Sequence, residues 1–121
     1  MKKHYDRHDA KRLVPLLEAI TREIADRLAS VHSLEARLER MGRAGSGRRS
    51  PERLDAQAEL AMHRREIRMA GKEIEALGCV SDEENPTEVL IPGRDGNLQH
   101  GFRWQFGDGG IHAVASDPSL A

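Results

Sequence analysis

Apolar residues recur every three or four positions from residue 13 to residue 41 of this chain. The series is Leu13, Leu17, Ile20, Ile24, Leu28, Val31, Leu34, Leu38 and Met41. This spacing predicts a long α-helix with one apolar stripe. Asp6 is a suitable N-cap, and Gly42 marks the expected end. Pro15 removes a helical hydrogen bond, so we expect a kink there or a short separate turn before the main helix.

A second helix is predicted after the glycine-rich segment 42–50, with Ser50 as its N-cap, Pro51 at its first position and Gly78 at its end. Its stripe consists of Leu54, Ala58, Ala61, Ile67, Ala70, Ile74 and Leu77. Because the connecting segment is short, we expect residues 1–78 to form an antiparallel helical hairpin.

From residue 79 onward the pattern is that of short strands and turns. Segments 88–91, 101–106 and 111–114 alternate in polarity or lie between turn-rich segments, and Phe102, Trp104 and Phe106 share one face. We therefore expect residues 79–121 to form a small antiparallel β-meander and tail packed on the helices. The fold class is mainly α, and 121 residues suit a single domain, 1–121.

The two stripes are expected to be too wide for one hairpin to cover. A second copy, giving a homodimeric bundle of antiparallel helices of the coiled-coil type, is the favoured solution, and a monomer covered by its own tail is the alternative. Charge is also uneven: residues 1–78 carry 17 Lys and Arg against 13 Asp and Glu, whereas residues 79–121 carry 2 against 7. This polarity favours either packing of the tail on the hairpin or attraction between chains, unless the acidic residues only form a solvated turn.

Composition excludes several classes of protein. Cys79 is the only cysteine, which excludes an intrachain disulfide and a multi-cysteine zinc site. The charged start and the lack of an apolar run of about 20 residues argue against a secretion signal or a membrane span, so we expect a cytoplasmic protein.

The opening segment from Tyr5 to Pro15 resembles the start of the bacterial domain-of-unknown-function family 2203. Further matching segments follow in the same order, namely Leu77 to Val80, Leu90 to Pro92, Arg103 to Asp108, and Ile111. The resemblance implies a long helical hairpin followed by a small strand region, and it implies no activity.

The chain departs from this family at the signature Cys-Trp-Arg-x-Gly-Glu, where only Trp104 and Gly107 carry over. Arg103, Gln105 and Asp108 stand in place of the Cys, Arg and Glu, and the later Trp-His pair is replaced around Val114 and Ala115. If the Cys and His form a site in relatives, the resemblance implies that this chain has lost it.

Two clusters of residues suggest chemistry. The first cluster has helical spacings that can hold a metal ion in a bundle, and it consists of His32 with Glu35, and of Glu59 with His63 and Glu66. The expectation for His63 is nevertheless a half-buried histidine satisfied by a neighbour such as Glu59. Arg43, Arg48 and Arg49 could contact nucleic acid from the loop between the helices, but no recognised binding motif surrounds them. The favoured function is a non-enzymatic, self-associating interaction or structural protein with no identified cofactor, and metal binding is the alternative.

Overall fold

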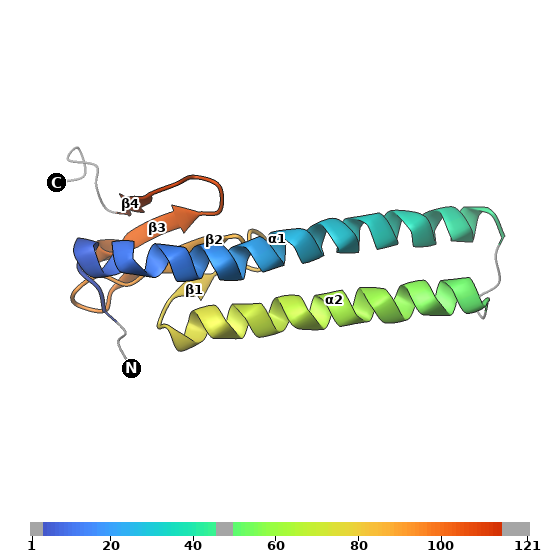
Figure 1. Cartoon of the computed structure of the whole chain (residues 1–121), viewed down its shortest axis with the longest axis horizontal. Coiled ribbons are helices and arrows are strands. Elements are labelled where there is room, and N and C mark those ends of the chain that lie inside the picture. The colour runs from blue at the N-terminus through green and yellow to red at the C-terminus, as the bar shows by residue number, and fades with distance from the viewer. Residues whose placement is uncertain (1–3, 46–49, 115–121) are drawn as a thin grey trace.

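The computed structural model describes residues 4–45 and 50–114 and contains two long antiparallel helices with a small sheet at one end (Figure 1). Helix α1 spans Arg7–Arg43, and helix α2 spans Pro51–Ala76. The predicted hairpin and C-terminal antiparallel sheet are confirmed. Neither helix combines the length and the apolar character that a bilayer span requires, within the residues described.

Three of the predicted helix ends are confirmed. Asp6 caps α1 by accepting a hydrogen bond from the Asp9 amide at 2.7 Å, and Ser50 caps α2 by accepting one from Arg53 at 3.2 Å. Gly78 follows α2 with a φ of 85°, a conformation that glycine adopts at little cost.

The predicted end of α1 and the alternative of a separate first turn are wrong. Helix α1 runs unbroken through Pro15 and past Gly42, and the left-handed residue after the helix is Gly45, with a φ of 77°. Ala10 and Leu17, which flank Pro15, are fully buried. Their packing offsets the hydrogen bond that the proline removes, because tertiary burial supplies most of the stability of a helix in a protein.

The predicted stripe of α2 is wrong in its first half. Leu54 is half exposed, and Ala58 and Ala61 are also exposed, whereas Ala56 and Leu60 are buried against α1. The residues from Ile67 to Ile74 follow the predicted stripe. Both series fit a helical period, and alanine gives too little hydrophobic contrast to choose between them.

The sheet has four antiparallel strands in the order β1-β2-β3-β4. These are β1 (Val80–Ser81), β2 (Glu88–Ile91), β3 (Phe102–Gln105) and β4 (Ile111–Ala113), with the 3-10 helix η1 (Leu98–His100) before β3. In the register Val89 pairs with Trp104, and Ile91 pairs with Phe102. The inward aromatic face is confirmed for Phe102 and Trp104, which are 9% and 2% exposed, while Phe106 follows the strand and is half-buried.

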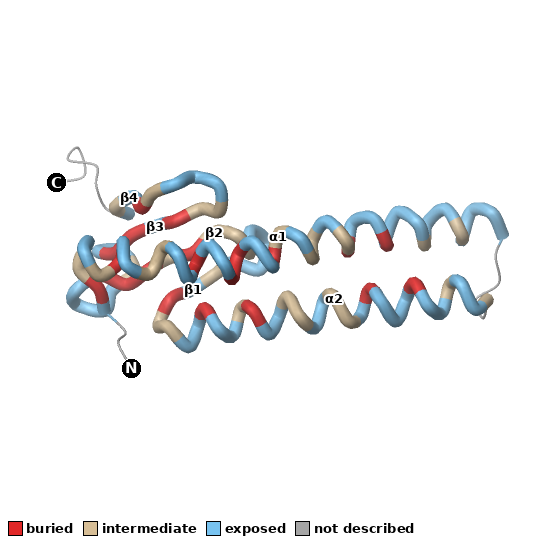
Figure 2. Tube along the Cα trace, viewed as in Figure 1, coloured by how far each residue is buried: buried red, intermediate tan, exposed pale blue. Residues whose placement is uncertain are grey.

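The core lies in two parts along the hairpin (Figure 2). At the sheet end, α1 and α2 pack with the inner face of the sheet around Leu17, Ile24, Ile74 and Trp104. Beyond the sheet the core is formed by the helices alone, and its buried members are Val31, Leu34, Ala56 and Leu60. One chain therefore covers much of both stripes, while Leu13, Leu28 and Leu38 of α1 remain half-buried.

Candidate functional site

A groove lies between the helices where the sheet ends, and it has a volume of about 690 Å³. Ile24, Leu28 and Val31 of α1 and Ile67 of α2 supply its apolar residues. The other lining residues are Arg64, Arg68, Gly71, Lys72 and Glu75 of α2, and Ser81, Asp82, Glu83 and Pro86 near the sheet. The groove exists because the sheet covers only one end of the hairpin and the β1–β2 connection closes that end.

Charge is ordered along this groove. Arg64, Arg68 and Lys72 follow one another at intervals of four residues on α2, and Asp82 and Glu83 stand at the sheet end. Arg64 forms an ion pair with Glu35 of α1 at 2.6 Å. In the part of the chain that the structure describes, no other charged group that lines the groove has an ion-pair partner.

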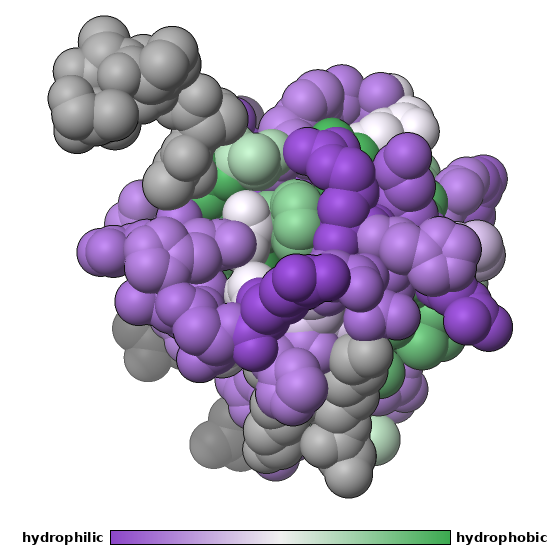
Figure 3. All heavy atoms as spheres, turned by 90° about the vertical axis from the view of Figure 1, so that its left-hand side faces the viewer, coloured by the Kyte–Doolittle hydropathy of each residue, from purple (hydrophilic) through white to green (hydrophobic). Residues whose placement is uncertain are grey.

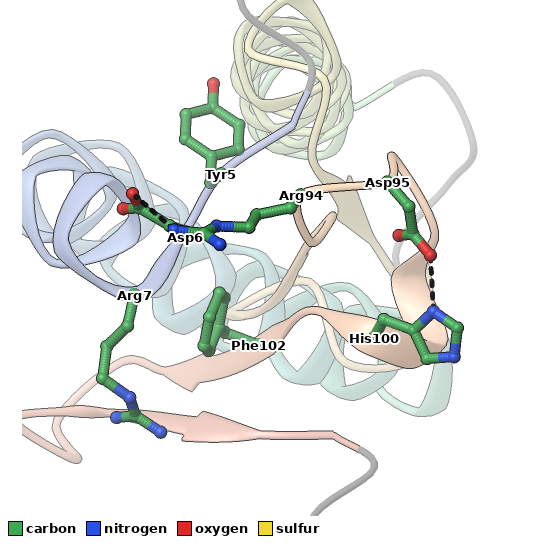
Figure 4. Close-up of a pocket in the computed structure, with 7 residues that line it drawn as sticks. All are labelled: Tyr5, Asp6, Arg7, Arg94, Asp95, His100 and Phe102. Carbon is green, nitrogen blue, oxygen red and sulfur yellow. Dashed lines mark hydrogen bonds and ion pairs between the residues drawn. The ribbon is translucent and has the colours of Figure 1, made fainter.

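A second hollow, of about 430 Å³, opens at the sheet end, where α1 begins (Figure 4). Figure 3 looks onto this end of the molecule and shows mainly hydrophilic side chains, with a few hydrophobic atoms between them. The N-terminal segment, the loop before β3 and β3 itself line the hollow. Its residues are Tyr5, Asp6, Arg7, Arg94, Asp95, His100 and Phe102.

The loop before β3 has little freedom to change shape. A Cβ atom on Gly93 would lie 2.3 Å from the His100 carbonyl oxygen, and one on Gly101 would lie 1.8 Å from the Ile91 carbonyl oxygen. The Asp95 carboxylate accepts a hydrogen bond from the Asn97 amide at 2.9 Å. These contacts hold the base of the loop closed and fix the position of His100.

His100 and Asp95 form an exposed pair in which the His100 Nδ1 atom lies 2.5 Å from a carboxylate oxygen of Asp95. This hydrogen bond, with that from the Asn97 amide, lowers the pKa of Asp95 below its ordinary value. His112 and Asp108 form a second such pair at 2.7 Å. Neither pair was predicted from the sequence, where each shows only as an aspartate followed by a histidine four or five residues later.

The charged side chains around this hollow have partners within the fold. Arg94 lies 3.9 Å from Asp6, and the guanidinium of Arg7 stacks over the Phe102 ring at 5.5 Å from its centre. Figure 4 shows Arg7 and Arg94 extending in different directions. Tyr5 is buried, and its hydroxyl donates a hydrogen bond to the Leu77 carbonyl at 2.6 Å, so it ties the N-terminal segment to the end of α2. The arrangement joins segments of the fold and offers no excess charge to an ionic ligand.

The residues predicted to bind metal lie in different surroundings. His63 is half-buried, but its neighbour is Arg27 and not Glu59: the Arg27 guanidinium lies 3.2 Å from Nδ1. Since arginine can only donate, Nδ1 accepts, and the lone pair that a metal ion would need there is occupied. His32 is exposed and Glu66 is half-buried.

The structure also separates the predicted ligands in space. Glu35 pairs with Arg64 at the groove, whereas Glu59 and His63 line another hollow, with Ser33 of α1. Positions 31 and 33 of a helix differ by about 200° in direction, so these hollows open on different faces of α1. Across residues 4–45 and 50–114, no three His, Cys, Asp or Glu side chains come together as a metal-binding group.

Of the arginines predicted to contact nucleic acid, Arg43 is exposed and forms an ion pair with Glu39 at 3.2 Å. Arg48 and Arg49 lie outside the described residues. Cys79 is 2% exposed, and burial raises the pKa of its thiol to about 12. The thiol is therefore protonated at neutral pH, which opposes a role as a nucleophile.

Comparison with known proteins places this fold in a family. The family described as an uncharacterized conserved protein, DUF2203, matches residues 3–114, which include both helices and all four strands. No curated protein and no solved structure matches the chain. Because the match covers nearly the whole sequence, the chain belongs to the DUF2203 family.

Proposed function

We propose that this protein is a non-enzymatic, self-associating interaction protein that acts as a homodimer. The observation that carries the proposal is the thin part of the hairpin beyond the sheet, which is only two helices thick. Its core has four buried residues, Val31, Leu34, Ala56 and Leu60. Helix pairs gain most of their stability from packing an apolar face, and four small or medium side chains supply little of it. A second copy would bury more surface and stabilise this part of the hairpin.

The charge pattern supports association with a like chain. Basic and acidic side chains that lack an ion-pair partner among the described residues occur together in the groove, at Arg68, Lys72, Asp82 and Glu83. Such a surface can satisfy its charges against a copy of itself, and interfaces between identical chains are commonly of this self-complementary kind. The metal-binding alternative has no observation of comparable weight in its favour.

Sedimentation velocity and light scattering over about 1–200 µM test the proposal. The expected result is a species of twice the mass of one chain that dissociates on dilution, with weaker association at high salt because exposed charges are screened. A single-chain mass throughout this range, at low and at moderate salt, would overturn it.

A further inference from the structure

We infer that the groove beyond the sheet is the surface on which a second copy of this chain docks, with the two α2 helices antiparallel and crossing at Gly71. This inference rests on the proposed function, since it identifies the surface used for self-association. Three features of the groove carry it: a helix backbone left uncovered at one glycine, charges that a two-fold axis can pair, and apolar side chains that one chain leaves incompletely covered.

The backbone is accessible at Gly71. A Cβ atom placed there would meet no heavy atom within 4 Å, although the residue is inside α2 and lines the groove. Glycine within a helix costs about 0.5–1 kcal/mol relative to alanine, and the open space shows that packing within the single chain does not require a glycine there. A bare position on a helix allows the axis of another helix to approach closely, as small residues do at helix–helix contacts.

Two of the groove's charges, one on each side of Gly71, have opposite sign, while Lys72 directly follows the glycine. Arg68 precedes it by three residues and Glu75 follows it by four, and both line the groove without an ion-pair partner among the described residues. If a two-fold axis passes near Gly71, a residue before it in one copy faces a residue after it in the other. Arg68 of each copy then lies beside Glu75 of its partner, and this pair occurs twice.

The same symmetry matches the two ends of the groove. Its basic end, at Arg64 and Arg68, is placed over the end of the partner's groove that holds Asp82 and Glu83. An acidic peptide in the groove would be repelled by its acidic end, and a basic peptide would be repelled by its basic end. A copy of the chain satisfies both ends, so charge complementarity favours it over a peptide of one sign.

The apolar residues of the groove support the same occupant. Leu28 and Ile67 are half-buried and lie between the fully packed core at the sheet end and the small core of the thin part of the hairpin. A helix seated in the groove would remove their remaining surface from water. Burial of such residues at the centre of an interface, inside a ring of charged pairs, is typical of stable protein contacts.

A charge-exchange experiment tests this interface. Arg68→Glu and Glu75→Arg are each expected to weaken the dimer by about tenfold or more, because each change places like charges together at two symmetric positions. The double variant Arg68→Glu/Glu75→Arg restores the opposite pairing, and its dissociation constant is expected to return to within about threefold of wild type. Arg65→Glu and Glu73→Arg are matched controls on exposed positions of α2 that do not line the groove.

Cross-linking provides a second test that does not depend on charge. In a Cys79→Ala background, Gly71→Cys places a thiol beside its own copy at the two-fold axis, and mild oxidation is expected to give a disulfide-linked dimer. Met69→Cys, at an exposed position of α2 outside the groove, is the control and should cross-link far less. Circular dichroism checks that every variant keeps its helices.

The outcomes separate the inference from the proposed function. A dimer that neither single charge reversal weakens, or that Gly71→Cys fails to link, overturns the groove as the interface while self-association stands. Wild-type chains that remain single at every concentration overturn both. Weakening by the single changes without recovery in the double variant overturns the antiparallel crossing at Gly71.

Discussion

Replacing Gly101 by alanine should destabilise the protein more than replacing any described glycine outside the loop before β3 by alanine. The added Cβ atom would lie 1.8 Å from the Ile91 carbonyl oxygen, 2.8 Å from the Gly93 nitrogen and 2.9 Å from the Ile91 carbonyl carbon. All three neighbours are backbone atoms, so no side chain can turn aside. The two segments must separate by about 1 Å or more to reach an ordinary contact distance.

The cost follows from what this separation disturbs. Ile91 is fully buried and lies opposite Phe102, the residue next to Gly101, in the β2–β3 register. The Gly101 carbonyl also accepts a hydrogen bond from the Val114 amide at 3.0 Å. Forcing one methyl group into a packed interior costs about 1–3 kcal/mol where side chains can adjust, so we expect a loss of about 3 kcal/mol or more here. That is a large fraction of the 5–15 kcal/mol that stabilises a typical domain.

Urea unfolding followed by the fluorescence of Trp104, the single tryptophan, measures this loss at a fixed protein concentration. Trp104 is 2% exposed and pairs with Val89 and Ile111 in the sheet, so its emission should shift when the sheet unfolds. Gly110→Ala is the matched control, since no atom lies within 4 Å of its Cβ position and its φ is ordinary; its change should stay within about 0.5 kcal/mol. If Gly101→Ala is as stable as this control, the reasoning about the closed loop is refuted.

Three further predictions follow from single residues. Gly71→Ala should stabilise the monomer by about 0.5–1 kcal/mol in urea unfolding at low concentration, because alanine is the better helix former and has open space there; a loss of stability would show that the space is not open. The pKa of Cys79 is raised to about 12, above that of an unfolded thiol, so its contribution to stability is complete below about pH 8.5 and is lost as the pH rises toward 12. The unfolding free energy of wild type should therefore fall relative to that of Cys79→Ala over this pH range, by up to about 1.4 kcal/mol per pH unit. A difference between the two proteins that stays constant with pH would contradict the raised pKa. His100→Ala should raise the pKa of Asp95 toward its ordinary value in an NMR titration, and an unmoved pKa of Asp95 would mean that the pair does not form in solution.

Local signals predicted the helices well, because they depend on neighbours in the sequence. Asp6 and Ser50 cap the helices as expected, since a cap needs only its own side chain and the amides of the next turn. Gly42 misled the prediction of the end of α1, because a glycine can sit inside a helix, and of these two glycines it is Gly45 that has the left-handed backbone. Strand β1 was missed because two residues are too few to alternate, and its pairing with β2 is set by the tertiary fold.

The groove could not be predicted from the sequence. Its residues come from α1, from α2 and from the connection between β1 and β2, and the gap between them depends on how far the sheet extends along the hairpin. His63 was correctly expected to be half-buried, but its contact with Arg27 crosses between helices whose register the sequence does not specify.

The uneven charge of the two halves of the chain was expected to favour packing of the tail on the hairpin or attraction between chains, unless the acidic residues only form a solvated turn. If the acidic tail packed on the basic hairpin by attraction, ion pairs should join the sheet to the helices with acids on the sheet side. The ion pair found between these parts in the described residues is Arg94 with Asp6, where the cation belongs to the tail. The sheet is held instead by apolar contacts around Trp104 and Ile74. Arg68, Lys72 and Asp82 have no ion-pair partner among the described residues, and in the proposed dimer they would face charges of a second copy along this groove.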